Sequence, residues 1–334
     1  MPVAVVGASG YTGLELIKIL LSHPYFDLKI VAASEEGDSI DTIHPSLKGI
    51  LNLKVKKADA KEIAKKSELV FLALPHKTAM GFAKELLNEG ARMVDLSADY
   101  RLELEVYEKF YCPHEDKENL PKAVYGLPEF YRKEIAKADL VANPGCYPTA
   151  SLLALLPFLD VLDSSYPIFI DAKSGVSGAG KKCSEKTHFV SINENIFSYN
   201  PLSHRHAPEI EEKIFKISGK NFHINFVPHL LPVTRGMLVS VYGVLRDEID
   251  VEARLREFYK DEKFVRVRDF PVDIKSTAGT NFCDIFAKRD KKALFVSSSI
   301  DNLLRGASSQ AVVNANIMCS FAEDTGIPFL AYVP

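Results

Sequence analysis

The chain begins with Met1-Pro2-Val3-Ala4-Val5-Val6-Gly7-Ala8-Ser9-Gly10-Tyr11-Thr12-Gly13, and this stretch predicts the architecture of its first half. Val3–Val6 is typical of a buried strand, and Thr12–Leu21 has the apolar periodicity of a helix. Gly7–Gly13 therefore joins a strand to a helix N-terminus, where glycines let a pyrophosphate approach and unpaired N–H groups can bind it. We interpret the loop as a dinucleotide site. Its GxxGxxG spacing is not the commoner GxGxxG, and the alternative is an ordinary strand-to-helix turn.

Up to about residue 145, short apolar runs alternate with helical patterns, which predicts parallel βαβ units. Further strands are expected at Leu28–Ala33, Leu69–Leu74, Ala91–Leu96 and Leu140–Ala142, and helices at Ala60–Lys66 and Thr78–Asn88. Residues 100–135, rich in Tyr, Glu, Lys and Pro, are expected to form an irregular excursion. The first half is therefore expected to be an α/β domain with a parallel sheet.

After about residue 160, strand-like runs follow one another with fewer helices between them, which favours a mixed or antiparallel sheet with helices on one face. These runs are Pro167–Ala172, His223–Pro228, Met237–Leu245, Phe264–Val267 and Ala293–Ser298. Ala307–Phe321 is expected to form a final apolar helix. With 334 residues, two domains are the expected organisation.

The composition excludes several classes of protein. With 47% hydrophobic and 25% charged residues, the chain is neither disordered nor collagen-like nor a coiled coil. A net charge of −3 and the absence of a basic run make nucleic acid and membrane surfaces unfavourable partners. The N-terminus has no positively charged segment, so we expect no signal peptide and a cytoplasmic protein. The uncharged run Leu140–Leu159 is broken by Pro and Gly, so a buried strand, turn and helix are expected instead of a membrane span.

Cysteine usage indicates one reactive thiol in a reducing compartment. The five cysteines are odd in number and contain no CxxC pair, and they are Cys112, Cys146, Cys183, Cys283 and Cys319. Cys146 lies in Asn143-Pro144-Gly145-Cys146-Tyr147-Pro148-Thr149, between an apolar strand and an apolar helix. Because Pro148 is tolerated only in a first helical turn, Cys146 must lie at the helix N-terminus, where the dipole favours a thiolate. We expect Cys146 to be a nucleophile and the other four to be ordinary thiols.

Three other segments could serve such a nucleophile. His204-Arg205-His206-Ala207-Pro208-Glu209 offers two histidines on an extended segment before a helix, suited to catalysis or anion binding. We do not expect a metal, because no compact third ligand is nearby. Lys173–Lys181, rich in Gly and Ser, follows a strand, and Arg235 lies in a turn; both could bind an anionic substrate.

The end of the second strand bears on cofactor choice. Ser34 could accept the 2′-phosphate of NADP, whereas Glu35 and Glu36 would repel it. The alternative is that both carboxylates are solvated loop residues without a role in cofactor choice.

Together the motifs resemble one known family. Gly7–Gly13, Asp95–Arg101, Asn143–Thr149, Ser174–Gly180, His204–Glu209 and Pro232–Met237 occur in the order found in the N-acetyl-γ-glutamyl-phosphate reductases of the semialdehyde dehydrogenase superfamily. The resemblance implies a discontinuous Rossmann domain, residues 1–147 and 306–334, and a glyceraldehyde-3-phosphate-dehydrogenase-like α+β catalytic and dimerisation domain, residues 148–305. Glu35 and Glu36 depart from the basic residue that follows Ser in many relatives.

The resemblance also implies roles for individual residues. Cys146 would be the nucleophile, and His204 and His206 the acid/base and orienting pair, in either order. NADP(H) would be held by Gly7, Ser9, Gly10, Tyr11, Thr12, Gly13, Ser34, Pro75, Ser177, Gly178, Asn314 and Asn316. The acyl phosphate substrate would contact Ser97, Arg101, Asn143, Lys173, Ser174, Glu209 and Arg235. The implied reaction passes through a Cys146 thioester and releases inorganic phosphate, in a homodimer or homotetramer.

Two other functions compete with this interpretation. One is the related reductase of lysine biosynthesis, whose aminoadipyl phosphate is attached to a small acidic carrier protein. Such a carrier favours a basic surface, which a net charge of −3 does not indicate. The other is a dinucleotide-binding redox sensor in which Cys146 is oxidised and no hydride is transferred.

Overall fold

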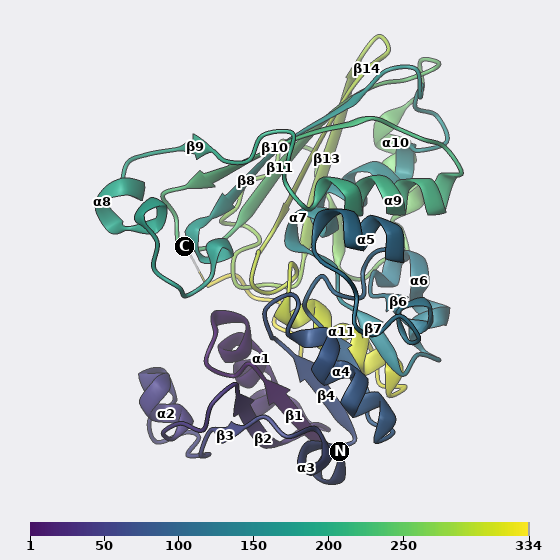
Figure 1. Cartoon of the computed structure of the whole chain (residues 1–334). Helices are drawn as coiled ribbons and strands as arrows, with labels where there is room; N and C mark the ends of the chain where they lie inside the picture. The colour runs from purple at the N-terminus through teal and green to yellow at the C-terminus, as the bar shows by residue number, and fades with distance from the viewer. Residues whose placement is uncertain (333–334) are drawn as a thin grey trace. The chain divides into compact units, whose positions relative to one another are not determined.

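The computed structural model describes residues 1–332, which form two compact units (Figure 1). Unit 1 comprises Met1–Gly145 and Ala307–Pro328, and unit 2 comprises Cys146–Gly306 and residues 329–332. This contact-based division differs from the expected domain bounds at residues 146–147, at residue 306 and at the C-terminus. The C-terminal difference has a local cause, because Tyr332 packs against Gly279 and lies under the Arg235 guanidinium at 5.9 Å.

Unit 1 contains a seven-stranded parallel sheet in the order β3-β2-β1-β4-β5-β7-β6. Its strands are β1 (Pro2–Val6), β2 (Asp27–Ala33), β3 (Lys56–Lys57), β4 (Leu69–Leu72), β5 (Arg92–Asp95), β6 (Val124–Tyr125) and β7 (Leu140–Ala142). Its helices are α1 (Tyr11–Ser22), α2 (Ile40–Ile43), α3 (Ala60–Lys66), α4 (Ala79–Asn88), α5 (Leu104–Phe110), α6 (Pro128–Ile135) and α11 (Ser308–Met318). β4 and β7 are buried at every position, as continuous apolar runs in a sheet covered on both faces should be.

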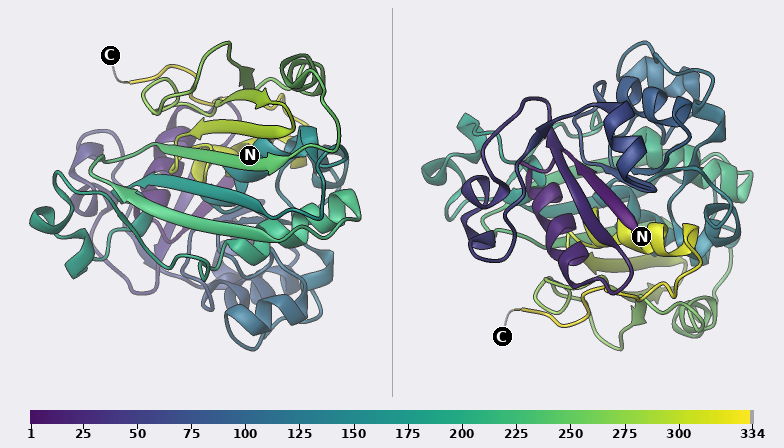
Figure 2. Two further views of the ribbon diagram at one scale, coloured as in Figure 1. Left: turned by 90° about the horizontal axis from the view of Figure 1, so that it is seen from above. Right: turned by 90° about the horizontal axis from the view of Figure 1, so that it is seen from below.

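The expected irregular excursion contains regular structure. Residues 100–135 include α5, α6 and β6, and β6 extends the sheet by pairing parallel with β7. A strand of two residues is too short to produce an alternating pattern, so no sequence pattern indicated it. The helix expected at Ala307–Phe321 is α11, which is buried at every position and packs against α1 (Figure 2).

Unit 2 contains a seven-stranded mixed sheet in the order β12-β13-β14-β11-β8-β10-β9. Its strands are β8 (Ile168–Gly175), β9 (Phe197–Ser198), β10 (Ile224–Leu231), β11 (Met237–Val244), β12 (Val265–Val267), β13 (Cys283–Asp290) and β14 (Ala293–Ile300). Its helices are α7 (Cys146–Leu155), α8 (Phe189–Ile192), α9 (Ala207–Ser218) and α10 (Val251–Phe258). Helices α7, α9 and α10 pack on the sheet, and alternate strand residues face them, as the mixed sheet predicted from the sequence requires.

Short 3-10 turns complete both units: η1 (Pro45–Leu47), η2 (Leu120–Lys122), η3 (Leu156–Phe158), η4 (Val176–Ala179) and η5 (Glu185–Thr187). Among the described residues, no helix is both long and apolar enough to cross a membrane.

Candidate active site

The glycine loop of unit 1 has the form that a pyrophosphate site needs. Gly7 has φ +89°, and a Cβ atom there would collide with the Ala73 carbonyl. A Cβ atom at Gly13 would lie 2.7 Å from Ala8 Cα, whereas one at Gly10 would meet only the Gly7 carbonyl, at 3.6 Å. Gly10 is the N-cap of α1 and no side chain caps the helix, so its first N–H groups face an uncrowded cradle. The residues present therefore fit a dinucleotide.

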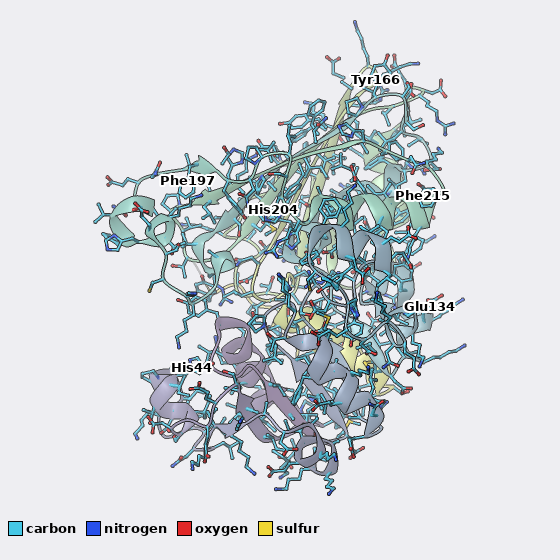
Figure 3. All side chains as sticks on the ribbon, in the orientation of Figure 1. His44, Glu134, Tyr166, Phe197, His204 and Phe215 are labelled. Carbon is cyan, nitrogen blue, oxygen red and sulfur yellow. The ribbon has the colours of Figure 1, made fainter. Side chains whose placement is uncertain are left out.

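The loop is fixed to the end of β2. The Ala32 carbonyl accepts hydrogen bonds from Gly7 N–H at 2.8 Å and from Ala8 N–H at 3.1 Å. Buried His44 donates from Nε2 to the Ala8 carbonyl at 2.9 Å (Figure 3). Because a carbonyl only accepts, the Nε2 atom of His44 must carry its proton. His44 acts from 36 residues away, and no local sequence pattern revealed this contact.

Ser97, Arg101 and Asn143 meet where β5 and β7 end. Arg101 Nε donates to the Asn143 carbonyl at 2.7 Å, and the Ser97 hydroxyl donates to Asp95 Oδ2 at 2.6 Å. Burial, and then the neighbouring Asp99, raises the pKa of Asp95 to about 7. Arg101 is only 5% exposed, and its guanidinium also donates to a backbone carbonyl after β5. Arg101 therefore links the loops that follow β5 and β7.

Pro75 and Ser34 occupy the same edge of the parallel sheet. Pro75 follows β4, and its carbonyl accepts from the amides that begin the next helix. Ser34 follows β2 directly. Ligands bind at the carboxyl ends of the strands in sheets of this kind.

The two asparagines of α11 lie in different surroundings. Asn314 Nδ2 donates to Asn143 Oδ1 and to the Gly126 carbonyl, both at 3.0 Å. Its Oδ1 atom is buried and has no hydrogen-bond donor within the described residues. Asn316 Oδ1 instead bonds His23 Nε2 at 3.0 Å, beyond the C-terminal end of α1.

The structure therefore places Asn316 away from the glycine loop, and its contact with the cofactor stays a prediction. Its side chain lies at the end of α1 opposite to the glycine loop. Residues two apart on a helix do not face the same side, which is why Asn314 and Asn316 separate.

In unit 2, Cys146 is the first residue of α7, as Pro148 predicted. A Cβ atom on Gly306 would lie 2.6 Å from Cys146 Cβ and 2.6 Å from the Asn302 carbonyl, so only glycine fits beside the cysteine. All five cysteines are free thiols. Stabilisation of a Cys146 thiolate by the helix N-terminus stays a prediction.

Tyr147 brings the histidine pair to the start of α7. Its ring contacts His204 and His206 at centroid distances of 5.7 and 5.8 Å, and the two imidazoles lie 4.9 Å apart. The segment is a turn that leads into α9 and not the extended chain that we expected, because Ala207 and Pro208 start the helix directly.

The hydrogen bonds of the pair fix one tautomer. His206 N–H donates to His204 Nδ1 at 3.2 Å, so the neutral His204 ring carries its proton on Nε2. Burial, assisted by the adjacent Arg205 charge, lowers the pKa of His204 to about 4. His204 is therefore a neutral N–H donor at pH 7.

Tyr199 belongs to the same cluster and was not predicted. Its hydroxyl lies 3.0 Å from that of Tyr147, which donates in turn to the His229 carbonyl at 3.3 Å. Burial raises the pKa of Tyr199 to about 12, and the charge of a Cys146 thiolate adds to the shift. A single tyrosine outside any motif left no signal in the sequence.

The Gly/Ser segment packs around Asn302, which the sequence reasoning also missed. Asn302 Nδ2 donates to the Ser177 hydroxyl at 3.0 Å, and Gly236 N–H donates to Asn302 Oδ1 at 2.8 Å. A Cβ atom on Gly178 would lie 2.8 Å from Ser174 Oγ. The segment does not follow β8 as expected, because residues 173–175 are the last three of the strand.

Lys173 points away from this cluster. Neighbouring strand residues face opposite sides of a sheet, so Lys173 and Ser174 diverge. Lys173 Nζ forms an ion pair with Asp171 Oδ2 at 2.7 Å on the other face. Lys173 and Ser174 therefore do not face the same side of the sheet, and a substrate contact by Lys173 stays a prediction.

The side chains of Glu209 and Arg235 both lie largely inside the protein. Glu209 lies in the first turn of α9 and is 1% exposed. Arg235 lies in the bend between β10 and β11, as expected, with its Nε 3.1 Å from the buried Asp301 Oδ2.

Comparison with known proteins identifies the family. Residues 2–138 match the model described as "Semialdehyde dehydrogenase, NAD binding domain", and residues 146–302 match "Semialdehyde dehydrogenase, dimerisation domain". The chain is 60% identical over 332 residues to the N-acetyl-γ-glutamyl-phosphate reductase of Sulfurovum sp., covering 99% of both proteins. The chain belongs to the N-acetyl-γ-glutamyl-phosphate reductases of the semialdehyde dehydrogenase family.

Other relatives agree with this assignment. The N-acetyl-γ-glutamyl-phosphate reductase of Wolinella succinogenes is 58% identical over 334 residues, covering 100% of this chain and 99% of that protein. Aspartate semialdehyde dehydrogenase II of Vibrio cholerae has the same fold, with a TM-score of 0.73 at 18% identity over 96% of this chain and 98% of that one. The Candida albicans aspartate semialdehyde dehydrogenase, solved with NADP, also has a TM-score of 0.73, at 14% identity over 97% and 99% of the two chains.

Proposed function

We propose that this chain reduces N-acetyl-γ-glutamyl phosphate to N-acetyl-L-glutamate 5-semialdehyde and inorganic phosphate with NADPH, in arginine biosynthesis. The observation that carries the proposal is Cys146 at the N-terminus of α7, with the imidazoles of His204 and His206 packed on the adjacent Tyr147. The high identity to reductases of this name over the full chain supports the same activity.

The dinucleotide would be held by the glycine loop, with its pyrophosphate on the first N–H groups of α1. When bound, the reduced nicotinamide supplies a hydride. The buried, unsatisfied Oδ1 atom of Asn314 is an acceptor that an amide group of the cofactor could satisfy.

The chain's own residues divide the remaining chemistry. The Cys146 thiolate attacks the carbonyl carbon of the acyl phosphate, and the C–O bond to phosphate breaks with its electron pair, leaving a thioester. His206 accepts the proton of the Cys146 thiol beforehand, which produces this thiolate. His204, neutral at pH 7, donates from Nε2 to the oxyanion that forms at the same carbon. Once a hydride has added to the thioester carbon, the resulting hemithioacetal collapses by breaking its C–S bond, which releases the semialdehyde and returns the thiolate.

We assign His204 as the hydrogen-bond donor, and therefore His206 as the base, because the pKa of His204 is lowered. A group with a pKa of about 4 is a weak base at neutral pH, and catalytic bases work best with a pKa near the operating pH. A neutral imidazole with its proton fixed on Nε2 is well suited to donate a hydrogen bond.

The proposed assembly is a homodimer formed through the open face of the second sheet. Phe169, Tyr242 and Phe295 lie side by side across β8, β11 and β14 on this face, and the first two are 52% and 46% exposed. An exposed aromatic row is typical of a buried protein contact. We expect Tyr242→Asp to shift the sedimentation coefficient toward that of a monomer, and an unchanged value would contradict this assembly.

The activity is tested by the reverse reaction, the phosphate-dependent oxidation of N-acetylglutamate semialdehyde. Cys146→Ser should bind the dinucleotide normally and lose this oxidation, whereas Cys183→Ser, which alters an exposed thiol, should keep both. Oxidation that persists in Cys146→Ser would refute the mechanism. A wild-type protein that binds NADP, forms sulfenic acid on Cys146 and oxidises no substrate would be a redox sensor.

A further inference from the structure

The end of β2 carries the charges that bear on cofactor choice. The residue after this strand lies beside the adenosine ribose in folds of this kind, where a carboxylate binds a 2′-hydroxyl and a cation binds a 2′-phosphate. Glu35 and Glu36 follow Ser34 here. On sequence alone, both carboxylates would oppose NADP.

The segment that leads into the short edge strand β3 changes this charge balance. Lys54, two residues before β3, forms an ion pair with Glu36. Gly37 N–H donates to the Val55 carbonyl at 3.0 Å, and Val55 N–H donates to the Asp38 carbonyl at 3.2 Å. These bonds hold Lys54 opposite Glu36, so one of the two carboxylates already has its counter-charge.

Strand β3 itself places another lysine beside the end of β2. Lys57 is the direct partner of Ala33 in the parallel register, and Ala58 N–H donates to the Ala33 carbonyl at 2.9 Å. Neighbouring strands lie about 4.8 Å apart. A lysine side chain spans more than that distance, so its ammonium can reach a group next to Ser34.

Of the two lysines of β3, Lys57 is the one whose charge is not neutralised by a carboxylate. Lys56 forms an ion pair with Glu62 Oε1 at 2.5 Å, and Lys66 shares the same carboxylate. Within residues 1–332, Lys57 is exposed and no ion pair joins it to a carboxylate. The Ala32 carbonyl, one residue earlier on β2, receives both amides of the glycine loop. The free cation and the pyrophosphate cradle therefore flank the same strand end.

We propose that Lys57, together with Ser34, forms a 2′-phosphate site supplied by strand β3, and that Lys54 supports it by neutralising Glu36. Lysine binds phosphate as a compact point charge with three donors, which suits a site reached from a neighbouring strand. The inference rests on the proposed use of NADP(H). It adds a residue of β3 to the specificity that Ser34 provides at the end of β2.

The first test measures binding without catalysis. Calorimetric titration with adenosine 2′,5′-bisphosphate and with adenosine 5′-monophosphate gives the preference for the 2′-phosphate directly. We expect the wild type to prefer the bisphosphate and Lys57→Met to reduce that preference at least tenfold, with little change in binding of the monophosphate. Lys57→Arg should retain most of the preference, which separates charge from folding. Lys84→Met, at an exposed position of α4, is the matched control and should match the wild type.

The second test uses the enzyme. The ratio of kcat/KM with NADP⁺ to that with NAD⁺ should fall at least tenfold in Lys57→Met, and also fall in Lys54→Met, where Glu36 loses its counter-charge. An unchanged ratio in Lys57→Met, or a wild type that binds both nucleotides equally, would overturn the inference. A wild type with the expected nucleotide preference and no oxidation of N-acetylglutamate semialdehyde would refute the proposed function alone.

Discussion

Gly306→Ala should inactivate the protein by displacing the nucleophile. The added methyl would lie 2.6 Å from Cys146 Cβ and 2.6 Å from the Asn302 carbonyl oxygen, and 3.0 Å from Asn302 Cα. Carbon atoms in contact prefer about 3.5–4.0 Å, so either the start of α7 or the turn at Asn302 must move by about 1 Å. A displacement of about 1 Å at a reacting group can cost roughly 100-fold in rate.

The same overpacking has a cost in stability. Inserting a methyl group into a filled site typically costs about 1–3 kcal/mol. For units of this size, 1 kcal/mol corresponds to about 2–4 °C in Tm. We therefore expect a folded protein with a Tm lower by several degrees and with kcat lower by about two orders of magnitude.

The assay follows phosphate-dependent oxidation of N-acetylglutamate semialdehyde, together with the rate of Cys146 alkylation by iodoacetamide. Gly81→Ala in α4 is the control, because its methyl would meet Glu115 Oε2 at an ordinary 3.5 Å. Alanine in a helix is favoured over glycine by about 0.5–1 kcal/mol, so this control should be slightly more stable and fully active. A Gly306→Ala protein with wild-type kcat and alkylation rate would refute the idea that this contact positions the thiol.

Three other variants test the electrostatics and the cofactor loop. His204 has a pKa of about 4 in the folded protein and 6.5 as an unperturbed imidazole. The unfolded chain therefore binds more protons between these values, and stability falls by up to roughly 3 kcal/mol as the pH drops from 6.5 to 4. His204→Asn should remove that loss in urea titrations at pH 5 and 7, and an unaltered pH dependence would contradict it. The pKa of Asp95 is raised to about 7, so folding takes up a proton between pH 3.8 and 7, and stability declines as the pH rises through that range. Asp95→Asn should flatten this decline. Parallel curves of stability against pH for the variant and the wild type would exclude the effect. Gly13→Ala would bring a methyl within 2.7 Å of Ala8 Cα and should weaken NADP binding at least tenfold by calorimetry; normal binding would mean that the loop can relax.

Elements with strong local constraints were predicted from the sequence. Val3–Val6 and Leu69–Leu72 are continuous apolar runs, and both are buried central strands. Pro148 confines Cys146 to a helix N-terminus, because proline can occupy only the first turn. In each case a single residue type or a short periodic run excludes every other local structure.

Features that depend on strand and helix bounds were harder to predict. Ending the strand at Ala172 left Lys173 in a loop beside Ser174. The observed strand continues to Gly175, and the alternation of a strand then directs the two side chains to opposite faces. The prediction that groups Asn316 with Asn314 meets the same difficulty on a helix, where two positions that are two residues apart face different sides.

The residues missed altogether act over long sequence separations. Asn302 reaches Ser177 across 125 residues, and Tyr147 meets Tyr199 across 52. Neither Asn302 nor Tyr199 lies in a motif with a recognisable chemical purpose. Such contacts exist only after the sheet of unit 2 has brought β8, β9 and β14 together.

Cofactor preference illustrates why a local reading of charge can mislead. Glu36 repels a phosphate when it is considered alone, yet Lys54 lies 18 residues away in sequence and lowers the pKa of Glu36 by pairing with it. The potential at a site is the sum over all charges near it in space, and screening in water extends over about 10 Å, which is further than the separation of two strands. A residue on β3 therefore counts as much at the end of β2 as the residues that follow β2. If Lys57 provides the free positive charge there, the acidic pair becomes compatible with NADP because the sheet, and not the motif, sets the local charge.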